Sequence, residues 1–251
     1  MTIADNAMKT KILFLLLCLL SPGYCHLWAQ SPDEAFFRQE AAEASVLYRG
    51  HQAYAYNIHY NGYPWWSGAS YGTGDVRYNG KIYHGLALNV DAARQELLVR
   101  QAAGQGGKVL SRAFVEWFTL DGRRFVNLQA LSGPQAPSGY WEVLFDGRTR
   151  FLRQVSKTLR KDFNGEKRQM IGEGEPYDLR IHDTFVRDVR YCLLTEAGQV
   201  VPVRSKSQIR NLFPEQRKDI RRHVAALENR FNRSMSLEEY GMEVLKYVEA
   251  R

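Results

Sequence analysis

Aromatic side chains are the residues of this sequence best suited to hold a ligand. Nine of them fall within residues 54–83, among them Tyr63, Trp65, Trp66 and Tyr71. Rings of this kind stack on sugars, and their hydroxyl and indole N–H groups bond to ligand oxygens. Most of the nine suit the interior of a β-sheet equally well. Trp65 and Trp66 are adjacent and should face opposite ways, so at least one is expected outside the core. Tyr63, Trp65, Trp66 and Tyr71 are therefore the candidate ligand-binding residues.

One serine stands in a pattern found in hydrolases. Gly68-Ala69-Ser70-Tyr71-Gly72 matches G-x-S-x-G, which places a nucleophilic serine on a sharp turn between a buried strand and a helix. Neither element is predicted here, because Gly74-Asp75-Val76 begins another strand. A flexible loop is the favoured interpretation, and a serine hydrolase is the least favoured function.

Histidines and carboxylates show no spacing typical of a metal or acid–base site. After residue 29, no two histidines stand two or four positions apart. These histidines are His51, His59, His84, His182 and His223. The glycine-rich segments 71–74 and 104–107 are not followed by a helix that would cradle phosphate. We expect no catalytic residues, no metal and no cofactor, and hence a protein that is not an enzyme.

Positive charge gathers near the C-terminus. The chain has a formal net charge of +7, and Arg217, Lys218, Arg221 and Arg222 crowd one predicted helix. A solvated helix face is the ordinary interpretation. The alternative is a surface for an anionic glycan or lipid headgroups. A nucleic-acid partner is not expected, because no nucleic-acid motif is present.

The first 29 residues have the pattern of a secretory signal peptide. Lys9 and Lys11 precede the apolar run 12–20, and Ala29 is a suitable cleavage residue. The run is shorter than the roughly 20 residues that span a bilayer, so no transmembrane segment is expected after cleavage. The protein is predicted to be exported, either periplasmic or secreted, with association with the outer membrane as an alternative.

Cysteine usage agrees with a fold that needs no disulfide. Cleavage would remove Cys18 and Cys25 and leave only Cys192, which lies in the apolar run 189–194. We expect a buried, inert thiol. A lipoprotein acylated at Cys18 or Cys25 is a minor alternative.

Residues 53–203 have the two-residue period of β-strands, interrupted by turn signals. Asn79-Gly80, Asp121-Gly122 and Asp146-Gly147 each stand between apolar or aromatic segments, where they favour tight hairpins. Such frequent turns predict a mostly antiparallel β meander, folded as a twisted sheet or a partly closed barrel.

Helices are expected at both ends of this β region. Residues 31–48 predict an N-terminal helix, and residues 205–251 a helical C-terminal segment. In that segment Ile220, Val224, Leu227 and Phe231 follow a helical period, and Ser236 opens a capping box. The fold class is thus α+β, with a C-terminal helical hairpin in a single β-rich domain, residues 30–251.

One stretch resembles a known family. Residues 74–91 read GDVRYNGKIYHGLALNVD and fit the pattern G-x-V-x-Y-x-G-x-x-Y-x-x-x-x-L-x-x-D, with a helical tail opening near Ser205-Lys206. This resembles uncharacterised exported proteins of the Bacteroidota, although Asn89 stands where an aromatic residue is commoner. The resemblance implies an envelope location and no known catalytic residues.

These observations predict a non-catalytic exported binding protein of the cell envelope. Its partner would be another envelope protein, a glycan or a lipid. Two specific alternatives remain: a carbohydrate-binding module that uses its exposed aromatic residues, and a carrier of apolar ligands under the terminal helices.

Overall fold

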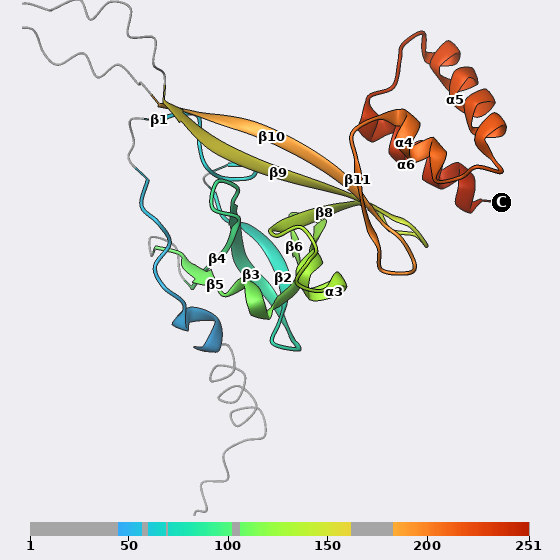
Figure 1. The fold of residues 1–251 in the computed structure, drawn as a ribbon. Coiled ribbons are helices and arrows are strands. Elements are labelled where there is room, and N and C mark those ends of the chain that lie inside the picture. Colours follow the sequence, from blue (N-terminus) through green and yellow to red (C-terminus); the bar gives the residue numbers. More distant parts are fainter. Residues whose placement is uncertain (1–44, 57–59, 69, 102–105, 162–182, 251) are drawn as a thin grey trace, which may run out of the picture. The chain divides into compact units, whose positions relative to one another are not determined.

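The structure, a computed structural model, describes residues 45–56, 60–68, 70–101, 106–161 and 183–250 (Figure 1). Val46–Arg251 forms one compact unit. The predicted signal peptide and the predicted loop at 164–176 lie outside the described residues. So does most of the predicted helix at 31–48, whose described end is a 3-10 helix, η1 (Ser45–Arg49). An N-terminal α-helix is therefore not supported.

Eleven strands dominate the described chain. They are β1 (Tyr60–Asn61), β2 (Gly72–Tyr78), β3 (Lys81–Asp91), β4 (Glu96–Arg100), β5 (Lys108–Leu110), β6 (Val115–Leu120), β7 (Arg123–Asn127), β8 (Tyr140–Phe145), β9 (Arg150–Lys161), β10 (Asp183–Leu194) and β11 (Val200–Val203). The helices are η2 (Arg112–Phe114), α3 (Leu128–Ser132), α4 (Lys206–Asn211), α5 (Arg217–Phe231) and α6 (Leu237–Glu249).

All eleven strands belong to one open sheet, with the order β1-β10-β9-β8-β7-β6-β2-β3-β4-β5 and β11 paired to β10. The prediction of a mostly β fold with a few helices is confirmed. The barrel alternative is wrong, because the sheet does not close. A single meander is also too simple: β2 to β5 run in one direction, and β6 then returns beside β2 to begin a second run. The sheet is mixed, since β1 pairs in parallel with β10.

Two of the three predicted tight turns are confirmed. Asn79 and Gly80 join β2 to β3 with φ of 51° and 77°, and Asp121 and Gly122 join β6 to β7 with φ of 50° and 76°. These positive angles are what a two-residue turn needs. The hairpin predicted at Asp146-Gly147 is also present, since β8 and β9 pair antiparallel, but its tight two-residue turn is wrong: β8 ends at Phe145 and β9 begins only at Arg150. There the loop packs on α6, where Thr149 N–H donates to Glu249 Oε1 at 3.3 Å.

Buried apolar side chains form three clusters in the sheet and helices. One lies where the two strand runs meet, around Leu88 of β3, Phe118 of β6 and Phe125 of β7. A second lies around Leu152 and Cys192. The third joins β9 and β10 to the C-terminal helices. The helices therefore cover one end of the long β9–β10 pair, as their grouping near β11 in Figure 1 also shows.

C-terminal helices form as their sequence patterns indicate. Ser236 accepts a hydrogen bond from Glu239 N–H at 3.2 Å, and Glu239 accepts one from Ser236 N–H at 2.8 Å, which completes the predicted capping box. Ile220 and Val224 of α5 are buried as the apolar stripe predicts. Phe231, the last residue of that stripe, is 60% exposed.

Candidate functional site

A hollow lined by aromatic side chains lies beside the β9–β10 pair. It has a volume of about 340 Å³. The rings that line it are Tyr54, Tyr56, Tyr60 and Phe185, and the cations that line it are Arg94 and Lys157. We call this set of residues the aromatic hollow.

Tyr56 holds the rings together. Its ring meets those of Tyr54, Tyr60 and Phe185 edge to face, with centroids 4.9, 6.4 and 5.5 Å away. Its hydroxyl donates to Asp91 Oδ2 at 2.6 Å. Burial and this hydrogen bond raise the pKa of Tyr56, so the hydroxyl stays protonated and the ring keeps its place.

The carboxylate that accepts the Tyr56 hydrogen bond also accepts hydrogen bonds from the backbone. Asp91 Oδ1 accepts the backbone N–H groups of Ala93 and Arg94, both at 2.9 Å, where β3 turns into β4. With Tyr56, three donors therefore surround this buried acid. Asp91 therefore holds Tyr56 in the wall of the hollow.

Lys157 of β9 lies across the face of an exposed ring. Its Nζ is 3.7 Å from the centroid of the Tyr63 ring and donates to the Tyr63 carbonyl at 2.8 Å. Arg94 lies over Tyr54 in the same way, at 4.8 Å, and also contacts Glu96 at 3.3 Å. Cation–π contacts hold both positive groups against the rings that line or adjoin the hollow.

Two positive residues face each other across the strands. Lys157 and Arg187 are direct partners in the antiparallel register of β9 and β10. Like charges at such positions destabilise a sheet. Partial burial, with the charge of Arg187, lowers the pKa of Lys157 to about 8. Among the described residues, no carboxylate lies within ion-pair distance of either side chain.

The four candidate aromatic residues from the sequence separate into two groups. Tyr63 is 46% exposed under Lys157, and Trp65 meets Tyr56 at 5.8 Å, so both adjoin the aromatic hollow. Trp66 instead packs on Phe125, at 5.1 Å.

Tyr71 lies elsewhere, under Arg100, whose guanidinium carbon is 4.4 Å from the ring centroid. Trp66 and Tyr71 are thus not part of one site with Tyr63. Both tryptophans are partly buried, so no exposed pair of indoles is formed.

Sequence reasoning missed Lys157 and Phe185. Neither stands near the aromatic segment in the sequence, and only the pairing of β10 with β1 and β9 brings them there. Neither strand alternates charged and apolar residues regularly, so no pattern in the sequence singles out Lys157 or Phe185.

The predicted basic surface on α5 is exposed. Arg217, Lys218, Arg221 and Arg222 all face solvent, and Arg222 lies 3.8 Å from Asp219. None of these four residues lines the aromatic hollow, and none is seen over an aromatic ring among the described cation–π contacts. The hollow beside α5 is a different one, of about 210 Å³, formed with α6.

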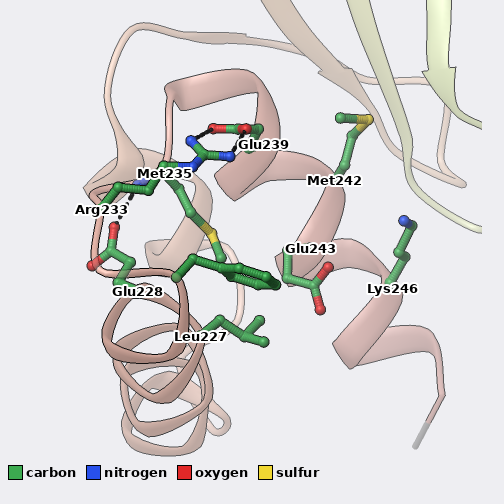
Figure 2. A pocket seen from close by; sticks show the side chains of 9 residues that line it. Leu227, Glu228, Arg233, Met235, Glu239, Met242, Glu243 and Lys246 are labelled. Carbon is green, nitrogen blue, oxygen red and sulfur yellow. Dashed lines mark hydrogen bonds and ion pairs between the residues drawn. The ribbon is translucent and has the colours of Figure 1, made fainter.

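Figure 2 shows Met235 near the middle of this second hollow, Met242 at one side, and charged groups around it. Met235 and Met242 lie opposite Leu227, while Arg233 pairs with Glu239. An apolar ligand of substantial size does not fit this volume. A carrier of apolar ligands, which the sequence left as an alternative, would therefore need a different cavity.

Residues considered for catalysis do not come together. Ser70 is exposed and leads directly into β2, without a helix after it. In the described part of the chain, no group of three or more His, Cys, Asp or Glu side chains is placed to hold a metal. Cys192 is buried and free, and burial raises the pKa of its thiol to about 12, so it is a poor nucleophile.

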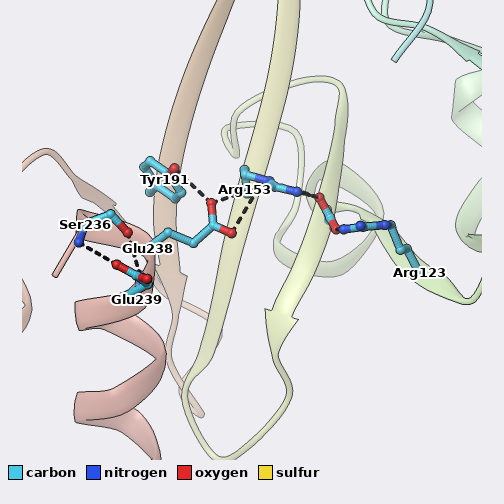
Figure 3. A network of polar contacts seen from close by, with 7 residues as sticks. Arg123, Arg153, Tyr191, Ser236, Glu238 and Glu239 are labelled. Atoms are coloured by element: carbon cyan, nitrogen blue, oxygen red, sulfur yellow. Dashed lines mark hydrogen bonds and ion pairs between the residues drawn. The ribbon is translucent and has the colours of Figure 1, made fainter. Parts of the chain in front are cut away.

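A network of charges ties α6 to the sheet (Figure 3). Glu142, only 3% exposed, accepts from Arg123 at 2.7 Å and from Arg153. Arg153 also donates to both oxygens of Glu238, at 2.8 and 3.0 Å, and Tyr191 donates to Glu238 at 3.0 Å. Every charge in this network has a partner, which marks it as structural.

Comparison with known proteins found no matching family model, no similar curated protein and no similar solved structure. Within the described residues, no helix combines the length and apolar character needed to cross a membrane.

Proposed function

We propose that this protein is a non-catalytic, exported binding protein, and that the aromatic hollow binds an acidic glycan. The observation that carries the proposal is the register of Lys157 opposite Arg187, beside a hollow lined by tyrosines. A carboxylated sugar would suit both the aromatic rings and the two cations. Its ring stacks on aromatic faces, and its carboxylate relieves the repulsion between the two cations.

Export and an envelope location remain part of the proposal, supported by the charged, apolar and small residues of the first 29 positions. The absence of an activated nucleophile among Ser70 and Cys192 supports binding over catalysis. A neutral-sugar module fits less well, because it would not need two cations in register.

Calorimetric titration with tetragalacturonate, and with neutral maltotetraose for comparison, tests the proposal. Tetragalacturonate should bind, and binding should weaken at high salt because screening reduces the attraction. Lys157→Met should lower its affinity at least tenfold. Maltotetraose should bind weakly or not at all.

The control is the triple variant Arg217→Ala, Arg221→Ala, Arg222→Ala, which removes the basic face of α5 and leaves the aromatic hollow unchanged. Its affinity for tetragalacturonate should match that of the unaltered protein. Loss of binding in the triple variant, with binding intact in Lys157→Met, would transfer the site to α5. Equal binding of both sugars would contradict the acidic ligand.

A further inference from the structure

The apolar stripe of α5 continues past the part of the helix that is buried. Ile220 and Val224 are buried in the cluster that contains Phe151. Further along the helix, Leu227 is only partly buried and Phe231 is 60% exposed. Phe231 has the largest exposed fraction of any large apolar side chain in the described residues. An apolar stripe that extends beyond its contacts within the chain leaves apolar surface for another molecule.

Leu227 and Phe231 line the hollow between α5 and α6, whose volume is about 210 Å³. Met235 and Met242 also line it (Figure 2). We call this hollow the α5–α6 groove. An apolar cavity of roughly 150 Å³ can hold benzene, so the α5–α6 groove has room for one phenyl ring. Methionine side chains adapt readily to the shape of such a guest.

Two of the three carboxylates that line the α5–α6 groove are paired with permanent cations. Glu228 Oε1 lies 3.3 Å from Lys206 Nζ. Arg233 Nη1 donates to Glu239 Oε2 at 3.0 Å. These two acids therefore have little need of a cation from another molecule.

The third carboxylate, Glu243, has a histidine as its partner. His223 Nε2 lies 3.0 Å from Glu243 Oε1, and this imidazole carries a charge only when it is protonated. Lys246, one turn further along α6, also lines the groove but is not within ion-pair distance of Glu243. Among the described residues, no lysine or arginine pairs with Glu243. Its carboxylate can therefore accept a cation from a second molecule.

Arg230 accompanies the exposed Phe231 ring at the end of α5. Its guanidinium carbon lies 5.9 Å from the ring centroid, and both side chains are exposed. No described carboxylate lies within ion-pair distance of Arg230. Asn232, with φ of 49°, ends the helix directly after Phe231. The end of α5 thus presents one ring and one cation, and the α5–α6 groove offers space for a ring and the carboxylate of Glu243.

We propose that the α5–α6 groove binds a second copy of this chain, in a symmetric dimer. The Phe231 ring of each copy enters the groove of the other, and Arg230 of each copy meets the Glu243 carboxylate of the other. Because one surface carries both the ring and the groove, the contact is self-complementary, as a two-fold axis requires. The contact is small, so the association should be weak, absent at micromolar and present at near-millimolar concentration. This surface is independent of the aromatic hollow.

Sedimentation equilibrium of the full-length protein, from micromolar to millimolar concentration, tests the dimer. The unaltered protein should pass from monomer to dimer over this range. Phe231→Ala should weaken the dimer at least tenfold. Arg230→Glu should weaken it as well, because it places two carboxylates opposite each other. The matched control is Phe114→Ala, which removes an exposed ring outside the C-terminal helices and should leave the dimer unchanged.

A mixing experiment separates a direct contact from a general disturbance of the helices. Met242→Lys places a charge in the α5–α6 groove and should prevent entry of the ring, so this variant should associate as weakly as Phe231→Ala. When the two variants are mixed, the intact ring of one meets the intact groove of the other, and they should associate more strongly than either does alone. A mixture that stays monomeric would overturn the proposal. So would an unaltered protein that is monomeric at millimolar concentration, or a Phe231→Ala protein that dimerises equally well.

Discussion

The two ends of the β9–β10 pair differ in whether their charged side chains have oppositely charged partners. At the end near β11, Arg153 is paired with Glu142 and Glu238 and lies under α6. At the other end, Lys157 faces Arg187 without a described acid. The same two strands thus carry one network in which each charge has an oppositely charged partner, and one pair of cations that has no such partner among the described residues. The first stabilises the fold, whereas the second leaves electrostatic energy that an anionic ligand can recover.

The largest effect should come from removing the helices that cover one end of the β9–β10 pair. Deletion of residues 214–251 would expose Phe151 and Leu193, which are completely buried, and would unpair Arg153 from Glu238. Each large apolar side chain contributes about 1.5–3 kcal/mol when buried, and a whole domain is stable by only about 5–15 kcal/mol.

We therefore expect this truncated protein to aggregate or to melt far earlier, as measured by size-exclusion chromatography and thermal unfolding. A monomer that melts like the full chain would show that the helices are a detachable arm, and would remove the contrast between the two ends.

Breaking the paired network alone should have the next largest effect. Arg153→Ala leaves the buried Glu142 with Arg123 as its remaining cation and should cost about 3–5 kcal/mol in the free energy of unfolding. Arg150→Ala is the control, because Arg150 pairs with the exposed Asp146 and should cost no more than about 1 kcal/mol. Urea unfolding of both variants measures the difference, and equal losses would contradict a structural role for the network.

The packing of the C-terminal helices on the β9–β10 pair also predicts that two substitutions in α5 differ in their cost to stability. Ile220→Ala should cost about 2–5 kcal/mol, because Ile220 is fully buried against the sheet cluster. Phe231→Ala should cost well under 1 kcal/mol, since Phe231 is 60% exposed. Thermal unfolding of both variants decides this. A large loss from Phe231→Ala would show that its ring is buried in solution.

The smallest expected effect concerns the open end and depends on pH. The pKa of Lys157 is about 8 in the folded protein, below the value of about 10.4 for a free lysine. Between these values the unfolded chain holds more protons, so this group makes stability rise with pH from about 8 to about 10.4. Measured against Lys157→Met, which lacks the group, the unaltered protein should gain stability over this range. If stability changed with pH in the same way in both proteins, the lowered pKa of Lys157 would be contradicted.

Local rules account for what could be predicted from the sequence. Asn79-Gly80 and Asp121-Gly122 form turns because few other residues accept their φ angles, and Ser236 with Glu239 caps α6 because both groups are three residues apart. At Asp146-Gly147 the predicted hairpin forms but its turn is longer than predicted; the loop there contacts α6, and that contact is not encoded within the turn itself.

The sequence by itself determined the β-rich class, most turns and the capped C-terminal helices, since these depend on neighbours a few residues apart. Only the tertiary structure decided which rings and charges meet. Trp66 and Tyr71 are close to Tyr63 in the sequence but pack elsewhere, whereas Phe185 and Lys157 reach the aromatic hollow from distant strands. The reason is strand order: β6 returns beside β2 and β10 pairs with β1, and pairings between such distant segments follow from the packing of the whole sheet.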